Sequence, residues 1–374
     1  MNSRNQFGTV VGAIFVWAAS SAAVLGQNGP ADDRSATGDE EDSRPAFSAT
    51  ITDQPQGAGC CDLGCEPSCG CPRWTAAADF IILDRIGSGN ATLVERVPGN
   101  LPPTTPGTEA LNSSDLQQGF AGGPRLDLIR HGDSGYDLEL AYFQIDGWHS
   151  DQTIVPADPQ NWRWLTMSCP GGFLQANEGR GQGMAWQYAT KLYDAELNVR
   201  WNPWCRVTML AGFRWINLGE NLQGALEPPT VWWEPPFWNT TTTNNLYGFQ
   251  IGTDWKIWER GRFSIDGLVK AGICDNDAEE NTGVSTMKIV RPSSASTNHA
   301  ACVGETGLQC KYQVTQGLLL KGGYEAIWLE GVALAPGQIQ ETYMPTPTTA
   351  QALGVNCNSG VFYHGATVGL EYSF

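Results

Sequence analysis

Charged side chains are scarce in this sequence, and basic ones especially so. Only 16% of the 374 residues are charged, against roughly 25% in an average soluble domain, and 22 Lys and Arg stand against 39 Asp and Glu. The net charge of −17 argues against a nucleic-acid partner, because phosphate binding needs a basic face. Much of the acidity lies between Gln27 and Glu66, so the rest of the chain is only moderately acidic.

Motifs for catalysis and for metal binding are also missing. The four histidines are isolated and form no H-E-x-x-H motif, which a zinc hydrolase of that type would need. No Gly-x-Ser-x-Gly elbow occurs, and the glycines do not form the strand–loop–helix cradle that binds phosphates. We therefore expect no enzyme, no catalytic residue, no metal site and no cofactor.

Long apolar runs are equally scarce. The first, Val10–Leu25, is rich in small residues and follows Arg4. It is short for a spanning helix, which needs about 20 apolar residues, so it predicts a signal peptide over residues 1–26; an uncleaved anchor is the less favoured alternative. No later run is long enough for a spanning helix, and any membrane attachment must therefore use strands.

Eleven cysteines in an exported chain indicate an oxidising compartment. Five of them follow an acidic stretch within residues 27–72, which we interpret as a disordered periplasmic linker because it cannot bury a core. Their spacing lacks the C-x2-C pairs of a zinc ribbon, which favours disulfides over metal. A sixth is expected in a periplasmic turn on the same side. The disulfide candidates are Cys60, Cys61, Cys65, Cys69, Cys71 and Cys205.

Period-2 alternation, in contrast, is abundant from Trp74 onward. Such alternation is typical of strands with two unlike faces, and most segments exceed the mean of about 5–6 residues in soluble sheets. The expected strands are Trp74–Arg85, Gln118–Arg130, Tyr136–Gly147, Trp186–Trp201, Arg206–Gly219, Asn245–Trp258, Arg262–Cys274, Glu305–Val314, Gly317–Glu330 and Val361–Phe374.

The connections between these strands alternate in length. Those after the second, fourth, sixth and eighth strands are short, whereas the others are long: about 86–117, 148–185, 220–244, 275–304 and 331–360. Outer-membrane barrels have short periplasmic turns and long outer loops, while a soluble sandwich has no reason to sort its loops. We therefore predict, over residues 73–374, an all-β, antiparallel, up-and-down transmembrane barrel of about ten strands (range 8–12). Its location would be the bacterial outer membrane and its surroundings outer-membrane lipid.

The faces opposite the apolar ones carry charges of both signs, which we expect to line the lumen. Two roles are open for them: a constriction that selects solutes by charge, or a salt-bridge network that fills a narrow barrel. Since barrels of about eight strands are filled by side chains and open porins have 16–18 strands, we favour the filled interior. The candidates are Arg125, Asp127, Glu139, Glu196, Arg200, Arg214, Asp254, Lys256, Asp266, Lys270, Lys321, Glu325 and Glu371.

The last expected strand ends with apolar residues at period 2, at Leu370, Tyr372 and Phe374. Such an ending is similar to the signal that the barrel-assembly machinery of outer membranes reads, which makes that machinery an expected partner. An ordinary C-terminal edge strand is less favoured, because a long apolar edge left open would invite aggregation.

Several strings occur in a recognisable order. They include Ala78–Leu83 (ADFIIL), Gly119–Arg125 (GFAGGPR), Leu210–Trp215 (LAGFRW), Asn245–Gly252 (NLYGFQIG) and Gly369–Phe374 (GLEYSF). Over about residues 74–374 this series resembles the planctomycete outer-membrane family of β-barrel porins. The resemblance implies a membrane barrel and carries over no catalytic or ligand residue, because the molecular function of that family is largely uncharacterised.

Aromatic residues gather in two expected outer loops, at Trp162 and Trp164 and in the string VWWEPPFW at Val231–Trp238. They could bind a surface glycan or protein, although packing among themselves to fold the loops is favoured. We thus expect a structural or surface role or a limited porin-like channel. The alternative is a secreted soluble β-protein that binds carbohydrate or a partner through aromatic loops. The oligomeric state is left open.

Overall fold

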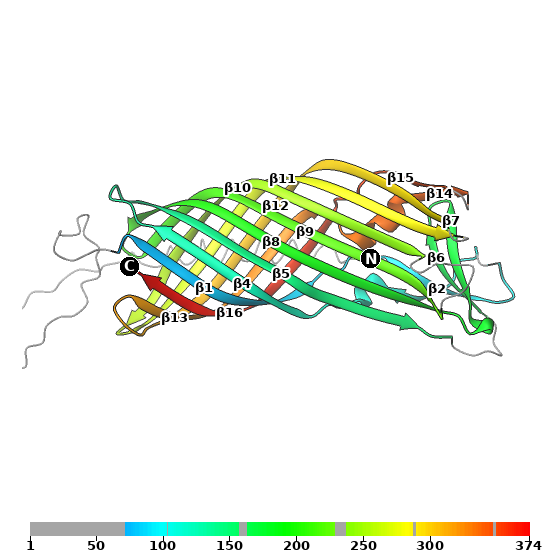
Figure 1. Ribbon diagram of the computed structural model, residues 1–374, viewed down its shortest axis with the longest axis horizontal. Coiled ribbons are helices and arrows are strands. Elements are labelled where there is room, and N and C mark those ends of the chain that lie inside the picture. The colour runs from blue at the N-terminus through cyan, green and yellow to red at the C-terminus, as the bar shows by residue number, and fades with distance from the viewer. Residues whose placement is uncertain (1–71, 103, 157–162, 229–236, 287–288, 347–348) are drawn as a thin grey trace, which may run out of the picture. The chain divides into compact units, whose positions relative to one another are not determined.

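The computed structural model describes residues 72–102, 104–156, 163–228, 237–286, 289–346 and 349–374. The expected signal peptide and the Cys60–Cys71 cluster lie outside these residues. Ten strands form one closed antiparallel barrel in the order β1-β16-β13-β12-β11-β10-β9-β8-β5-β4 (Figure 1). They are β1 (Trp74–Ile86), β4 (Phe120–Arg130), β5 (Tyr136–Ile154), β8 (Gly183–Trp204), β9 (Val207–Glu227), β10 (Trp238–Arg260), β11 (Phe263–Thr286), β12 (Ile289–Gln313), β13 (Leu318–Val332) and β16 (Ser359–Ser373).

The predicted fold class and all ten predicted barrel strands are confirmed, but six strands are longer than expected. The segments 220–244 and 275–304 were expected to be loops, and most of their residues instead extend β9, β10, β11 and β12. These extensions carry Asn, Thr, Ser and acidic residues on their outer face. Because this face meets water rather than lipid, the apolar alternation that marks a membrane strand is absent there.

The strand register fixes the tilt of the barrel. Paired residues that start at Ile86 and pass once through the other nine strands end at Trp74, a stagger of 12 residues on β1. For ten strands this stagger corresponds to a tilt of about 40°. Because the strands are tilted, register partners on neighbouring strands lie at different heights in the membrane. Residues at the same height are found by shifting the register along each strand by its share of the stagger.

A belt of exposed apolar side chains surrounds the barrel between two rings of aromatic residues. On β10, Phe249 and Ile251 are 78% and 68% exposed between Tyr247 and Trp258. At about 3.3 Å per residue and a tilt of about 40°, those two aromatics are about 28 Å apart along the barrel axis, close to the roughly 25 Å apolar band of outer-membrane barrels. The belt therefore matches a membrane-spanning surface.

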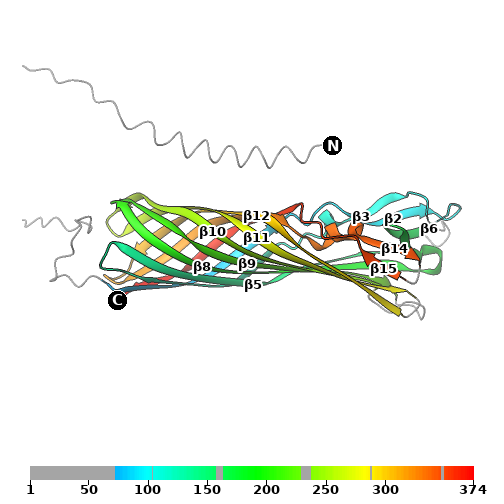
Figure 2. The ribbon, with the colours of Figure 1, turned by 90° about the horizontal axis from the view of Figure 1, so that it is seen from above.

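The long connections fold into small sheets at the outer end of the barrel (Figure 2). Strands β2 (Thr92–Pro98), β3 (Thr108–Asn112), β6 (Arg163–Cys169) and β7 (Gly172–Asn177) form a sheet in the order β3-β2-β6-β7, and β14 (Thr342–Thr346) pairs with β15 (Thr349–Ala352). The short 3₁₀ helices η1 (Ser113–Asp115), η2 (Glu178–Arg180) and η3 (Ala335–Glu341) join them.

These sheets and the strand extensions share a buried apolar core. Its members include Leu93, Leu165, Trp186, Leu222 and Trp238, drawn from both the loop sheets and the barrel extensions. We call this unit of loop sheets, strand extensions and shared core the outer module. No helix in the described part of the chain is long and apolar enough to cross a membrane.

Candidate functional site

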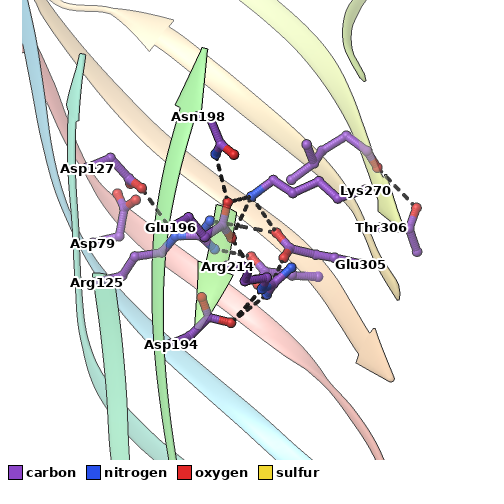
Figure 3. Close-up of polar contacts among 12 residues, drawn as sticks. Asp79, Arg125, Asp127, Asp194, Glu196, Asn198, Arg214, Lys270, Glu305 and Thr306 are labelled. Atoms are coloured by element: carbon purple, nitrogen blue, oxygen red, sulfur yellow. Dashed lines mark hydrogen bonds and ion pairs between the residues drawn. The ribbon is translucent and has the colours of Figure 1, made fainter. Parts of the chain in front are cut away.

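The structure turns the predicted lumen charges toward the barrel interior, and all but Asp127 and Lys256 form ion pairs with residues of other strands; these two pair within their own strand. The central group joins β8, β9, β11 and β12 (Figure 3). Lys270 Nζ lies 2.9 Å from Glu196 and 3.3 Å from Glu305. Arg214 Nη2 lies 2.6 Å from Asp194, 2.8 Å from Glu305 and 3.6 Å from Glu196. Two cations thus hold three carboxylates at the centre of the barrel.

Further contacts extend this central group toward β4, β10 and β13. Arg125 Nη1 binds Glu325 at 2.7 Å, and its Nη2 lies 3.7 Å from Glu305. Gln250 donates to Glu196 at 2.7 Å and to Asn198 at 2.9 Å. Each charge of this cluster lies beside an opposite charge, so the cluster offers few free charges to a solute. Glu305 is held by ion pairs alone, because neither of its carboxylate oxygens has a hydrogen bond in the described structure.

A second set of ion pairs lies closer to the periplasmic end. Arg200 binds Glu139 and, at 2.5 Å, Asp254. Lys321 lies 2.9 Å from Asp79. The remaining pairs join Lys311 with Asp266 and Glu371, Arg125 with Asp127, and Lys256 with Glu259. Every predicted lumen residue therefore has an oppositely charged neighbour in the structure.

Besides Glu259, which follows the end of its expected strand, sequence reasoning missed four members of these pairs: Asp79, Asp194, Glu305 and Lys311. Asp194 shares the strand face of Glu196, and Glu305 stands at the start of its expected strand. The signal was present, because residues at even spacing from a lumen residue face the same side of a strand. Applying that parity to every charged residue would have found them.

Above the charged group, buried apolar side chains fill most of the interior of the barrel, together with the Arg85–Glu220 ion pair. Trp148 packs on Tyr363 with ring centroids 5.1 Å apart, and its Nε1 donates to the Leu83 carbonyl at 3.1 Å. The same buried cluster includes Ile216, Leu218, Leu246, Val303, Ile327 and Leu329. Such a layer excludes water and continues the closure that the ion pairs begin.

The connection between β13 and β16 closes the interior from the outer side. Asn244 on β10 binds the backbone of Ala333 twice, at 2.7 and 2.8 Å. Glu220 on β9 accepts from the Ala335 amide at 2.8 Å and also binds the buried guanidinium of Arg85. Side chains of the barrel wall therefore hold η3 in the outer mouth.

One described cysteine departs from its expected place. Cys302, in the expected outer loop 275–304, lies within β12, whereas Cys274 and Cys310 lie in strands β11 and β12 as expected. All six described cysteines are unpaired, including the turn residue Cys205; the partners predicted for Cys205 lie outside the described residues. Burial raises the pKa of Cys169 to about 11, which keeps that outer-module thiol protonated and unreactive.

The loop aromatics are divided between the core and positions that are not described. Phe237 and Trp238 are buried, and Phe237 meets Trp186 edge-on with centroids 5.8 Å apart. Trp164 is half-buried on β6. Trp162 and residues 231–236 lie outside the described residues. Where these aromatics are described, they pack into the outer module instead of standing free for a ligand.

The final strand closes the barrel. β16 pairs with both β1 and β13, and the Phe374 carbonyl accepts from the Arg73 and Trp74 amides at 2.9 Å. Leu370, Tyr372 and Phe374 all point outward and are 49–58% exposed. Their assembly role stays a prediction. Within the described chain, no group of three or more His, Cys, Asp or Glu side chains could hold a metal ion.

Comparison with known proteins gives a family and distant barrel folds. The family described as "Putative beta barrel porin-7 (BBP7)" matches residues 184–374. The outer membrane protease OmpT from Escherichia coli is 10% identical, with a TM-score of 0.42, and covers 80% of this chain and 96% of its own. The Pseudomonas putida toluene transporter TodX is 8% identical, with a TM-score of 0.34, and covers 81% and 90%. No curated protein matches the sequence.

Proposed function

The chain belongs to the beta barrel porin-7 family and is a bacterial outer-membrane β-barrel, and we propose that it is a closed barrel that anchors the outer module at the cell surface. The outer-membrane location that the sequence predicts is confirmed, and the secreted soluble alternative is set aside. The proposed role is structural or surface-binding. Neither transport through the barrel nor catalysis is part of it.

The carrying observation is the filled interior. Arg214 and Lys270 bridge β8, β9, β11 and β12 through Glu196 and Glu305, and both cations are almost completely buried. An open porin keeps a water-filled passage between its charged side chains. Here the charges meet across the lumen, and apolar side chains occupy the layer above them, so the family name does not by itself imply conduction.

Conductance in planar lipid bilayers tests this proposal. The full-length protein, extracted from outer membranes and checked for folding by heat-modifiable gel migration, is expected to give no conductance steps. A general porin purified in parallel serves as the positive control for insertion. Reproducible steps from the wild-type barrel would overturn the closed-barrel proposal and favour the limited channel.

A matched pair of variants sharpens the test. The fourfold variant replaces Arg214, Lys270, Glu196 and Glu305 by Ser, which removes the side chains that meet across the lumen. It also carries Asp194→Asn, because Asp194 would otherwise be left buried without its Arg214 partner. The Lys256→Ser and Glu259→Ser variant removes an exposed pair near the periplasmic turn instead. If the wild-type barrel and this control variant give no conductance steps while the fourfold variant does, the central group is part of the closure.

Export and assembly follow from the same proposal. Residues 1–26 would direct export, residues 27–72 would remain as a periplasmic linker, and the ending Leu370, Tyr372 and Phe374 would be read by the barrel-assembly machinery. Deleting Phe374 is expected to lower the amount of heat-modifiable protein in the outer membrane. Equal amounts of folded wild-type and truncated protein would contradict that role.

A surface glycan or protein bound by the outer module is the partner that this role implies. Glycan-array or pull-down binding by whole cells that display the barrel tests it, with cells that lack the protein as the control. Binding that is equal in the two cell types would remove the surface-binding part of the proposal and leave the anchoring part.

A further inference from the structure

The apolar surface reaches higher on one side of the barrel than on the other. Following paired residues from Ile86 through β16, β13, β12 and β11 leads to Ile251 on β10, which lies five strands from β1. Half of the 12-residue stagger separates these two residues in height, so Ile86 lies level with about Asn245. At this height β10 shows Asn245, which binds Asn217 on β9 at 2.8 Å. On the opposite side Ile86 is 45% exposed and Phe120 is 65% exposed.

Lipid does not account for this asymmetry. The height of the hydrocarbon around a barrel is set by the whole belt, and β10 places the boundary between Asn245 and Tyr247. Exposed apolar side chains above that boundary are disfavoured in water and indicate a surface that another protein covers. Ile86 and Phe120 lie on β1 and β4, and β16 and β13 continue this side of the barrel next to β1 (Figure 1).

A polar pair lies within this apolar surface. Asp84 on β1 and His364 on β16 are register partners, with Oδ2 and Nε2 3.9 Å apart. His364 Nδ1 is 2.6 Å from the hydroxyl of Tyr324 on β13. Exposed apolar residues stand on both sides of Asp84 along β1, at Ile82 and Ile86. On β10 and β11, in contrast, the outer face stays polar from Asn245 and from Asp275 outward.

We propose that this face, formed by β13, β16 and β1 around Asp84 and His364, binds a second copy of the chain. In a two-fold dimer the same patch occurs on both subunits, and an acid beside a base on neighbouring strands is complementary to its own rotated copy. A two-fold axis along the membrane normal between the two strands brings Asp84 of one copy to His364 of the other, twice.

Small residues lie beside the pair on β16 and β13. Ala366 follows His364 on the outer face of β16, and Ala326 on β13 is the register partner of His364, while the rings of Phe362 and Tyr324 contact the imidazole. Small residues let two backbones come together in a membrane, where packing and polar contacts drive association. The dimer requires the membrane belt but is independent of whether the barrel conducts.

Reciprocal charge variants of the full-length protein test the proposal. Asp84→His gives a face with two histidines, and His364→Asp gives a face with two aspartates. Each variant alone is expected to weaken dimerisation in detergent or nanodiscs by at least about tenfold in Kd, measured by analytical ultracentrifugation. When the two variants carry different tags and are mixed, they are expected to form a heterodimer at wild-type strength, because both contacts are restored with reversed polarity.

The matched control builds the same pair elsewhere. Asn217 and Asn245 are register partners on β9 and β10, and Asn217→His with Asn245→Asp should leave the wild-type dimer unchanged. Heat-modifiable migration verifies that each variant is folded. The proposal is overturned if the wild-type protein is monomeric, if neither single variant weakens the dimer, or if the mixed variants fail to pair. A bilayer conductance result of either kind leaves it intact.

Discussion

The membrane belt and the outer module use the same strands with opposite polarity. On β10, below Asn245, the outward side chains Tyr247, Phe249 and Ile251 are apolar, while the inward positions include Gln250 and Asp254. Above Asn245 the outward positions are polar and the inward Trp238 is fully buried in an apolar core. The switch follows the solvent, because the face that meets lipid must be apolar and the face that meets water need not be.

The two interiors are consequently held together by different forces. The belt interior relies on buried ion pairs, which are costly to break once one partner is lost. The outer module relies on apolar burial, in which each lost side chain leaves a cavity. Substitutions in the belt interior should therefore destabilise the protein by leaving unpaired charges, and substitutions in the outer module by leaving cavities. Matched substitutions in the two regions can measure this difference.

The largest effect is expected from breaking the central ion-pair group. Arg214→Met leaves Asp194 buried without a cation and removes one of the cations beside Glu305, which should lower the free energy of unfolding by about 3–5 kcal/mol. Urea unfolding in lipid vesicles, followed by tryptophan fluorescence, measures it. Lys256→Ala breaks an exposed pair and should cost at most about 1 kcal/mol. Equal effects of the two substitutions would contradict the assignment of the central group.

A cavity in the outer module should have a comparable but local effect. Leu174 on β7 is 2% exposed within the outer core, and Leu174→Ala should destabilise that core by about 2–5 kcal/mol. Limited proteolysis of intact cells is expected to cut the loop sheets faster, while heat-modifiable migration shows the barrel still folded. Loss of the barrel together with the loops would show that the two halves fold as a single unit.

One substitution on two outward positions of β10 compares the surroundings directly. Ile251→Arg places a charge on the lipid face and should cost about 2–4 kcal/mol. Thr241→Arg places it on the extension, where water solvates it, and should cost within about 0.5 kcal/mol. Folding yield in vesicles and urea midpoints measure both. A similar cost at the two sites would mean that lipid covers the extension or that neither site meets lipid.

The barrel could be predicted from the sequence because membrane strands obey two constraints. Their side chains alternate between apolar and polar, and the connections between them alternate between short and long. Both were visible in residues such as Tyr247, Phe249 and Ile251, whose apolar side chains alternate with polar ones. The strand extensions could not be predicted because their outward residues, such as Thr241 and Thr243, meet water, and the neighbouring inward residues Thr240 and Thr242 are also polar. Alternation of polarity disappears when both faces carry Thr, although the strand continues.

The candidate site was foreseen in outline for a similar reason. Lumen charges stand out against apolar neighbours, as Arg214 and Lys270 do, but the pairing between strands depends on the 12-residue stagger, which no single strand contains. Glu220 and Asn244, which hold η3, have no sequence signal of this role, because their partners are backbone groups of Ala333 and Ala335 far along the chain.

The smallest effect concerns a carboxyl group in the outer module. Glu280 is fully buried on the β11 extension, and burial, with a contribution from the charge of Glu341, raises the pKa of its carboxyl group above the usual range. The folded protein therefore holds this proton to a higher pH than the unfolded chain. The associated stability is fully present below the unfolded pKa of about 4.3 and is lost as the pH rises through the folded value.

Glu280→Gln keeps the shape and removes the titration. The variant should therefore resist proteolysis of the outer module better than the wild type at neutral pH, while the two should converge as the pH falls toward about 4. Glu279→Gln is the matched control, since the neighbouring Glu279 points to water and should change little. A pH-independent difference between Glu280→Gln and the wild type would show that the carboxyl group contributes by hydrogen bonding, such as its bond from Thr282, rather than by charge. In that case the outer half of β11 would stabilise its buried carboxyl group through a hydrogen-bonding partner and not through protonation. The buried carboxylates of the membrane belt are likewise stabilised by partners, namely the cations of their ion pairs.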